Sequence, residues 1–181
     1  MKKKILITVV VLIAILFVVY NVGFEVGNVK IGKQKDLATT QDIAYKNSSF
    51  YKNYYSSNKL LVVNMWATWC KPCLGEVPLL NAIKEQYNND SICFLSLSID
   101  DDSTRLANYL TKGEFKFNDI TFDNLAYRNA IINLMDNQPI DKHIVSQTVP
   151  KTYLIKEQKI IKVLEGGIDK EELEGEINKL R

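Results

Sequence analysis

The feature that most constrains the fold is an apolar run that leads directly into a pair of cysteines. The run LLVVNMW, residues 60–66, is apolar except for Asn64, and Cys70 and Cys73 follow it closely. A run of this kind is typical of a strand that is buried on both faces of a sheet. The residues after Cys70 have a helical pattern, and Pro72 suits the first turn of a helix. The sequence therefore predicts that the cysteine pair lies where a central strand ends and a helix begins.

Strands and helices alternate along the rest of the chain. The pattern predicts strands in 60–66, 91–100 and 119–122, a hairpin in 151–167, and helices in 70–87, 103–113, 123–137 and 169–181. Ser103 is the expected N-cap of the second helix, and Gly113 is its expected end. Asp169 with Glu172 resembles a capping box at the start of the last helix. The order β-α-β-α-β-α-β-β-α predicts an α/β domain with one sheet and helices on both faces.

The N-terminus has the composition of a membrane anchor. Lys2, Lys3 and Lys4 precede sixteen residues, 5–20, of which only Thr8 is polar. A helix of about twenty residues spans roughly 30 Å, the thickness of a bilayer's hydrocarbon core. A cleavable signal peptide has a shorter apolar region and a small-x-small cleavage site, which the sequence YNVGFEVG does not offer. We therefore expect a single uncleaved transmembrane helix in 1–24, with its N-terminus inside and the rest of the chain outside the cytoplasmic membrane.

The remaining sequence divides into a spacer and a domain. Residues 25–58 form the expected juxtamembrane linker or N-terminal extension, which holds a short helix within 42–55 and an aromatic cluster expected to pack on the domain. Residues 59–181 form the expected globular domain. The net charge is +2, and Lys2, Lys3 and Lys4 supply more than all of it. The domain therefore lacks the clustered basic face that nucleic-acid binding requires.

The cysteine pair has the spacing and the surroundings of a redox-active dithiol. The thiolate is the attacking species in disulfide exchange, and the positive end of a helix stabilises an anion at its N-terminus. Lys71 adds a neighbouring cation. We therefore expect Cys70 to be the exposed nucleophile and Cys73, one helical turn later, to be the resolving thiol.

A cysteine pair with this spacing can also bind a metal or form a purely structural disulfide. A structural zinc site needs four ligands, and beyond the pair the chain has only Cys93, within an apolar strand, and His143. We therefore predict no metal site, and a structural disulfide that closes so short a loop would add little stability. A copper chaperone that uses Cys70, Cys73 and His143 stays open as an alternative.

The segments VVNMWATWCKPC and TVPKTYLI, with the helix between them, resemble thioredoxin-fold proteins. The resemblance is to the membrane-anchored thiol–disulfide oxidoreductases of the TlpA/ResA type, which include thioredoxin-like proteins of cytochrome c maturation. It implies a thioredoxin fold, with a central mixed sheet flanked by helices and preceded by an N-terminal transmembrane helix. It also implies that the protein needs no cofactor besides the Cys70–Cys73 disulfide.

The resemblance also assigns individual residues. Pro78 matches the proline that kinks the active-site helix, and Pro150 matches the cis-proline of the family. Glu76 matches a glutamate near the cysteines, where it could shuttle the proton of the resolving thiol. Asn64 stands where cytosolic thioredoxins carry a buried acid, and an amide cannot accept that proton. The expected substrate-binding residues are Trp69, Lys71, Pro72, Val149 and Pro150.

The direction of electron flow follows from the resemblance rather than from the motif. Lys71 and the helix terminus stabilise the Cys70 thiolate and therefore the reduced form of the pair, and a protein with a stabilised reduced form acts as an oxidant. TlpA/ResA-type proteins nevertheless act as reductants, so we expect reduction of protein disulfides, with apocytochrome c as one candidate substrate. The implied partner is a membrane electron conduit that re-reduces the dithiol. A disulfide-forming oxidant of the same fold is the alternative.

Two segments depart from the pattern of the family. The segment VSQTVP lacks the glycine usual before the cis-proline, and the connection NQPIDKHIV is longer than the fold requires. Both departures point to a target unusual for the family.

Overall fold

The computed structural model describes residues 24–26, 29–31, 45–87, 89–140, 142, 144 and 147–181. The predicted membrane anchor, residues 1–24, lies outside this part of the chain except for its last residue. Among the described residues, no helix is both long enough and apolar enough to cross a membrane. Two short strands, β1 (Phe24–Val26) and β2 (Val29–Ile31), pair with each other in an antiparallel ladder.

The domain is built on a five-stranded mixed sheet with the strand order β5-β4-β3-β6-β7. The central strand β3 is parallel to β4 and antiparallel to β6, so the predicted mixed sheet is confirmed. The five strands are β3 (Leu60–Trp66), β4 (Ile92–Ser98), β5 (Asn118–Asp119), β6 (Lys151–Lys156) and β7 (Lys159–Glu165). Glu157 and Gln158 form the turn of the β6–β7 hairpin, and both have positive φ angles.

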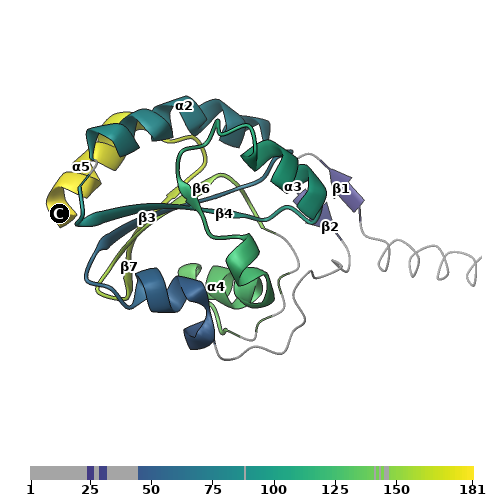
Figure 1. The fold of residues 1–181 in the computed structure, drawn as a ribbon, viewed down its shortest axis with the longest axis horizontal. Helices are drawn as coiled ribbons and strands as arrows, with labels where there is room; N and C mark the ends of the chain where they lie inside the picture. Colours follow the sequence, from purple (N-terminus) through teal and green to yellow (C-terminus); the bar gives the residue numbers. More distant parts are fainter. Residues whose placement is uncertain are drawn as a thin grey trace, which may run out of the picture.

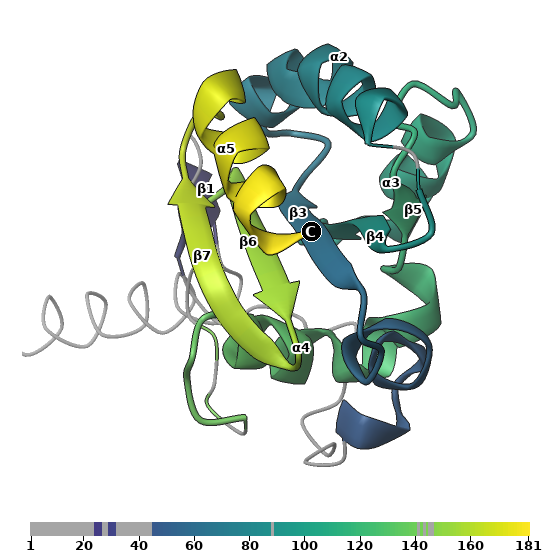
Figure 2. The same ribbon diagram turned by 90° about the vertical axis from the view of Figure 1, so that its left-hand side faces the viewer.

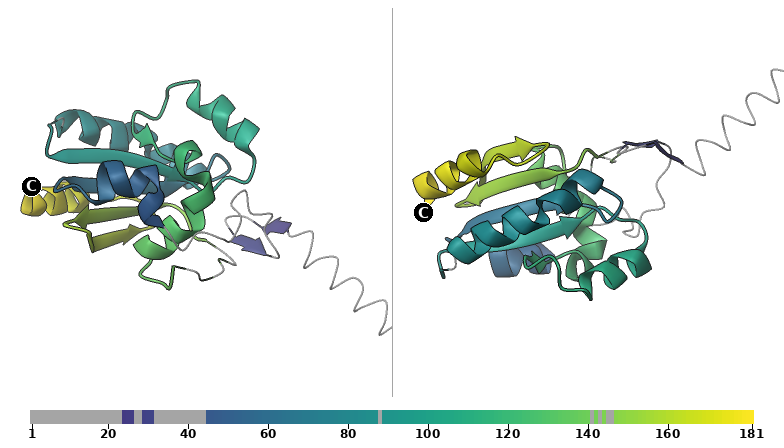
Figure 3. Two further views of the ribbon diagram at one scale, coloured as in Figure 1. Left: turned by 60° about the horizontal axis from the view of Figure 1, so that its bottom comes forward. Right: turned by 90° about the horizontal axis from the view of Figure 1, so that it is seen from above.

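Helices cover both faces of the sheet (Figures 1 and 2). Helices α2 (Lys71–Gln86) and α5 (Lys170–Leu180) lie on one face. Helix α4 (Arg128–Met135) and the short helices η1 (Tyr45–Asn47) and η2 (Tyr51–Tyr55) lie on the other. Helix α3 (Ser103–Leu110) lies toward the β4–β5 edge of the sheet. The predicted layers, and with them the thioredoxin fold, are present, and Figure 3 shows them from two further sides.

The core sits around β3, whose seven residues are all buried. This complete burial explains why the strand is apolar except for Asn64, because both of its faces contact apolar side chains. The core also includes Phe50 and Tyr55. The N–H of Phe50 donates to Asn124 Oδ1 at 2.9 Å, and the hydroxyl of Tyr55 donates to the carbonyl oxygen of Gln158 at 2.6 Å. The aromatic cluster before the central strand therefore packs on the domain, as predicted.

Asp102, not Ser103, is the N-cap of α3: its Oδ1 accepts the N–H of Arg105 at 2.9 Å. The α3 helix ends before Gly113, which has a φ of +67°, so the predicted stop signal is confirmed at this end. Asp169 is the N-cap of α5 and accepts the N–H of Glu172 at 2.9 Å, as predicted.

The region after β4 differs more from the prediction. Of the expected strand in 119–122, only Asp119 lies in a strand, the two-residue β5, because Asp119 Oδ1 accepts the N–H of Thr121 at 3.0 Å and turns the chain. The expected single helix in 123–137 is split into a 3₁₀ segment, η3 (Phe122–Tyr127), and α4. Asn124, inside η3, has a non-helical backbone conformation (φ −126°, ψ 19°), and its buried amide bonds to the backbone of Phe50 and of Ile120 instead of permitting a regular helix.

Candidate active site

Cys70 and Cys73 form a disulfide at the start of α2, with Sγ atoms 2.00 Å apart and Cα atoms 5.3 Å apart. Strand β3 ends at Trp66, and a tight turn, in which the Cys70 N–H donates to the carbonyl oxygen of Ala67 at 3.1 Å, leads into the helix. Cys70 is the N-cap of α2, and its Sγ accepts the N–H of Cys73 at 3.3 Å. The site therefore lies at the predicted strand–helix junction.

The exposure of the pair differs from the prediction. Cys70 is 0% exposed and Cys73 is 2% exposed, whereas Lys71 and Pro72 between them are exposed. The expectation of an exposed Cys70 is therefore wrong for the disulfide form. The reason is local: the Cys70 side chain turns inward over the first turn of α2, where it meets the Cys73 N–H and the Cys73 sulfur.

Helix α2 also carries Glu76 and Pro78. Cys73 shares the buried face of the helix with Val77 and Leu80, and Glu76 lies half-buried beside that face. Glu76 Oε1 accepts the N–H of Ile168 at 2.8 Å, while Oε2 is buried and has no hydrogen-bond partner among the described residues. Burial raises the pKa of the Glu76 carboxyl above its ordinary value, and the Ile168 N–H opposes part of that rise. Pro78 lies inside the helix.

The peptide bond between Val149 and Pro150 is cis, as the resemblance implied. Lys151 pairs with Met65 in the antiparallel register of β6 and β3, and Met65 is next to the last residue of β3. The register therefore places Pro150 beside the end of β3 from which the chain continues to the cysteines. The carbonyl oxygen of Pro150 accepts the N–H of Gly166 at 3.0 Å, which fixes this strand start to the end of β7.

Comparison with known proteins agrees with this geometry. Residues 58–158, more than half of the chain, match the family model described as thioredoxin-like. The chain belongs to the thioredoxin-like family. A relative named thiol-disulfide oxidoreductase ResA, from Bacillus anthracis, is 25% identical over 185 residues, which cover 99% of this chain and 98% of the relative.

Two solved structures show the same fold at low identity. StoA from Bacillus subtilis has a TM-score of 0.50 and 19% identity, over 66% of this chain and 82% of the other. A thiol:disulfide interchange protein of the thioredoxin family from Chlorobium tepidum TLS has a TM-score of 0.52 and 17% identity, over 71% and 83% of the two chains. The resemblance to TlpA/ResA-type proteins that was predicted from the sequence is thus confirmed.

This thioredoxin-like protein has an uncharged hydrogen-bonded pair in the neighbouring strands β3 and β6. Asn64 is 2% exposed, and its Nδ2 donates to Thr152 Oγ1 at 3.0 Å. The two residues are register partners in β3 and β6. An amide and a hydroxyl cannot replace a carboxylate as proton acceptor. The half-buried carboxylate on the helix that carries the dithiol is Glu76.

A buried acid that the sequence did not single out supports the turn before the thioredoxin-like dithiol. The Asp100 side chain is 0% exposed. Its oxygens accept the N–H of Thr68 at 2.8 Å, the Thr68 hydroxyl at 2.6 Å and the Ser98 hydroxyl at 2.7 Å. Arg128 donates to the Asp100 carbonyl oxygen at 2.6 Å. The signal in the sequence was its position after β4, because the ends of parallel neighbouring strands meet at one edge of the sheet.

The other residues considered from the sequence lie away from the dithiol or outside the described part of the chain. His143, which the copper-binding alternative requires, lies outside the described residues. Within the described ranges, no group of three or more His, Cys, Asp or Glu side chains is placed to hold a metal ion. Cys93 is half-buried rather than fully buried, and burial raises the pKa of its thiol. It pairs with Leu61, at the end of β3 farthest from the dithiol.

Proposed function

We propose that this protein is an extracytoplasmic thiol–disulfide oxidoreductase that reduces disulfides in other proteins. The observation that carries this proposal is the Cys70–Cys73 disulfide at the N-cap of α2, together with the cis-proline placed beside the end of β3. The ResA relative, which aligns along almost the whole chain, is a thiol-disulfide oxidoreductase by name. Trp69, Lys71, Pro72, Val149 and Pro150 are the proposed contacts to the substrate.

The proposed reaction proceeds in two exchanges. The Cys70 thiolate attacks one sulfur of the substrate disulfide, forms a mixed disulfide and releases the other substrate sulfur as a thiolate. Cys73 then loses its proton, attacks the Cys70 sulfur and releases the second substrate thiolate. Two electrons have passed to the substrate, and the product is the Cys70–Cys73 disulfide that the structure contains.

Glu76 is the proposed acceptor of the Cys73 proton. Glu76 lies one turn after Cys73 on α2. Among the described residues, no hydrogen-bond donor occupies its Oε2, so this oxygen can take a proton without losing a hydrogen bond. A raised pKa brings a carboxyl closer to neutral pH, where both taking and returning a proton are easier. Asn64 cannot take this role.

The exposure of Lys71 supports the reducing direction. An oxidant needs a strongly stabilised Cys70 thiolate, and the only charged residue between the cysteines is Lys71. Its side chain is exposed, so water and salt screen its charge.

In the same proposal, residues 1–24 anchor the domain outside the cytoplasmic membrane. A membrane electron conduit returns the dithiol to its reduced form, and apocytochrome c is a candidate substrate.

The equilibrium potential against glutathione tests the direction. We expect a value below about −220 mV, on the reducing side of the glutathione couple, and a value near the roughly −120 mV of strong oxidants would refute a reductant. Insulin reduction by the wild-type protein and by Cys70→Ala tests the activity itself. Equal rates for the two proteins would show that the dithiol does not carry out the reduction.

Trapping assigns the two roles. Cys73→Ala should retain substrates as mixed disulfides on Cys70, whereas Cys70→Ala should retain none, because the attacking sulfur is missing. The double variant Cys70→Ala/Cys73→Ala is the background control. Capture by Cys70→Ala but not by Cys73→Ala would show that the nucleophile has been assigned to the wrong cysteine.

A further inference from the structure

One carboxylate at the end of helix α4 is bonded to the chain on both sides of the cis-proline. Asp136 Oδ2 accepts a side-chain N–H of Gln147, three residues before Pro150, at 3.3 Å. Asp136 Oδ1 accepts the ammonium of Lys151, the residue after Pro150, at 3.2 Å. The same oxygen accepts the hydroxyl of Tyr153 at 2.6 Å. Asp136 therefore fixes both arms of the loop that carries the cis peptide bond to α4.

The ion pair between Asp136 and Lys151 is largely shielded from water. The side chain of Lys151 is 11% exposed, and that of Asp136 is 18% exposed. A second carboxylate, on Glu165 of β7, lies 3.5 Å from the Lys151 ammonium, but its own side chain is 69% exposed. Because water and salt screen an exposed charge, Asp136 is the stronger partner of Lys151.

The stability of the fold does not by itself explain why a carboxylate lies here. Asp136 is the C-cap of α4, and the partial negative charge at the C-terminus of a helix disfavours a carboxylate. A largely buried ion pair is often no more stable than apolar side chains of the same volume, because both charges lose their contact with water. What the pair does provide is a fixed connection between α4 and the loop with the cis-proline.

Backbone and side-chain bonds divide the work of holding this loop. The carbonyl oxygen of Pro150 accepts the N–H of Gly166 at 3.0 Å, which fixes the chain from Pro150 onward to the end of β7. The bond from Gln147 to Asp136 fixes the chain before Pro150. Val149, one of the proposed substrate contacts, lies in the part that Asp136 holds.

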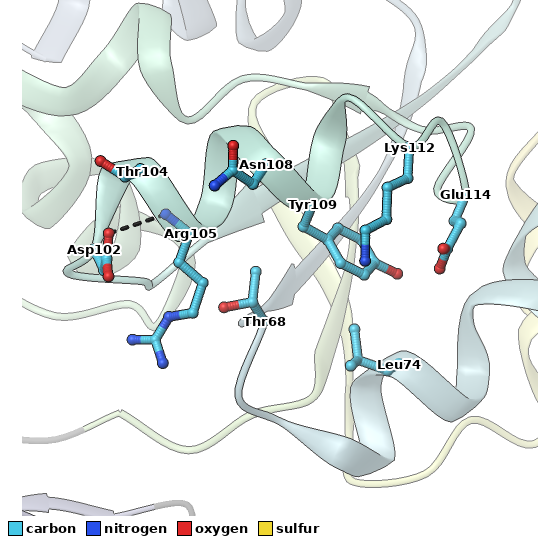
Figure 4. A pocket seen from close by; sticks show the side chains of 9 residues that line it. All are labelled: Thr68, Leu74, Asp102, Thr104, Arg105, Asn108, Tyr109, Lys112 and Glu114. Carbon is cyan, nitrogen blue, oxygen red and sulfur yellow. Dashed lines mark hydrogen bonds between the residues drawn. The ribbon is translucent and has the colours of Figure 1, made fainter.

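The other side of the dithiol carries an acidic side chain whose bond is local. Helix α3 follows β4 and Pro150 precedes β6, and these strands flank β3 on opposite sides. Figure 4 shows Asp102 in the groove between α2 and α3, where its Oδ1 accepts the N–H of Arg105 and caps its own helix. Asp102 and Asp136 thus have the same charge on opposite sides of the dithiol, and Asp102 provides a matched control.

We propose that Asp136 is a positioning residue for the reduction of protein disulfides, which holds the segment before the cis-proline where the substrate backbone meets Val149. The inference rests on the proposed function, in which Val149 and Pro150 contact the substrate. A segment that is already fixed does not have to be ordered when the substrate binds, so it binds the substrate more tightly than a loose one. Asp136 acts through this segment rather than on the reacting sulfur atoms.

Single-turnover oxidation of the reduced full-length protein tests this role. The protein is mixed with excess insulin or with hydroxyethyl disulfide, which is too small to pair with the Val149 backbone. Asp136→Asn keeps the shape of the side chain and removes its charge. We expect the half-saturating insulin concentration to rise about three- to tenfold in this variant, the range for one hydrogen bond. The limiting rate with insulin and the rate with hydroxyethyl disulfide should stay within about twofold of the wild type, because only binding is affected.

Two further Asp→Asn variants separate this role from effects of charge and of stability. Asp102→Asn removes the same charge on the other side of the dithiol, and Asn caps a helix about as well as Asp. Asp119→Asn removes a largely buried carboxylate that accepts bonds from Thr121 and Ser96 beside β5, on the side of β3 away from the cis-proline. Neither variant should change the half-saturating insulin concentration by more than about twofold.

Gln147→Ala removes the bond before the cis-proline alone. It should raise the half-saturating insulin concentration about twofold to threefold, and it decides the question if Asp136→Asn does not fold.

An unchanged or lower half-saturating concentration in Asp136→Asn, an equal rise in Asp119→Asn, or an equal slowing with hydroxyethyl disulfide would overturn the positioning role while leaving the oxidoreductase intact. Failure of the wild type to reduce both insulin and hydroxyethyl disulfide would overturn the proposed function and, with it, this inference.

Discussion

The hydroxyl of Thr68 offers a direct test of how the turn before the dithiol is held. Thr68 makes two bonds to the buried Asp100 carboxylate, one from its N–H at 2.8 Å and one from its hydroxyl at 2.6 Å. Thr68→Val keeps the shape of the side chain and the N–H but removes the hydroxyl. The substitution therefore isolates one hydrogen bond to a charged group.

The expected cost follows from that geometry. A hydrogen bond to a charged group contributes about 1.5–3 kcal/mol to the free energy of unfolding. Thr68 is half-buried, so water can replace part of the lost bond, and we expect the lower end, about 1.5 kcal/mol. For a domain of this size, that loss corresponds to a decrease of roughly 3–6 °C in Tm.

The assay is thermal and urea unfolding of the oxidised protein in a version of the chain that begins at Asp36. Thr68→Ser is the matched control, because it keeps the hydroxyl and should remain within about 0.5 kcal/mol of the wild type. In a double-mutant cycle with Asp100→Asn, the Thr68→Val change should cost less than in the wild type, with a coupling of at least about 0.5 kcal/mol. Equal losses for Thr68→Val and Thr68→Ser, or no coupling to Asp100, would refute the role given to this bond.

Three further outcomes follow from the structure. Burial raises the folded-state pKa of Glu76 above its ordinary value of 4.5, so ionisation of this carboxyl destabilises the fold. As pH rises from about 4 through the raised pKa, the Tm of the wild type should fall relative to that of Glu76→Gln, and above that pH the difference between the two Tm values should stay constant. A Tm difference that does not depend on pH would contradict this. Gly166→Ala, at a φ of +80°, should lower the free energy of unfolding in urea by about 1–2 kcal/mol. Gly175→Ala lies inside α5, where an added Cβ meets nothing within 4 Å, and should raise that free energy by up to about 1 kcal/mol. A change of the same sign in both variants would be inconsistent with this reasoning. Phe50→Ala should cost about 3–5 kcal/mol by the same measurement, because the ring is 0% exposed, and a loss below about 1 kcal/mol would show that this segment is not part of the core.

The parts of the fold that the sequence predicted are those that depend on local pattern. The central strand is apolar because both of its faces are covered, and the β6–β7 hairpin and the Asp169 cap are encoded by neighbouring residues. The dithiol itself was predictable for the same reason, since the strand, the turn, the cysteines and Pro72 are consecutive.

The features that the sequence did not predict depend on contacts between distant residues. Asn124 interrupts the predicted helix because it bonds to Phe50, 74 positions earlier. Asp100 supports the turn before Cys70 through Thr68, 32 positions away. Its position after β4 indicates the edge of the sheet on which it lies, but the residues next to it do not indicate Thr68 as its partner. The burial of Cys70, in contrast, has a local cause, the inward turn of its side chain, which the spacing of the motif does not determine.

The direction of electron transfer depends on which charges near the dithiol are shielded from water. The sequence alone places a cation, Lys71, between the cysteines and thereby favours an oxidant. In the structure this cation is exposed, whereas Glu76 is half-buried beside the face that carries Cys73. An exposed charge is screened more strongly than a buried one, so an ionised Glu76 opposes a thiolate at Cys73 more effectively than Lys71 stabilises one at Cys70. Charges arranged in this way favour the disulfide over the dithiolate, and a protein whose disulfide is favoured donates electrons, which is the proposed reaction.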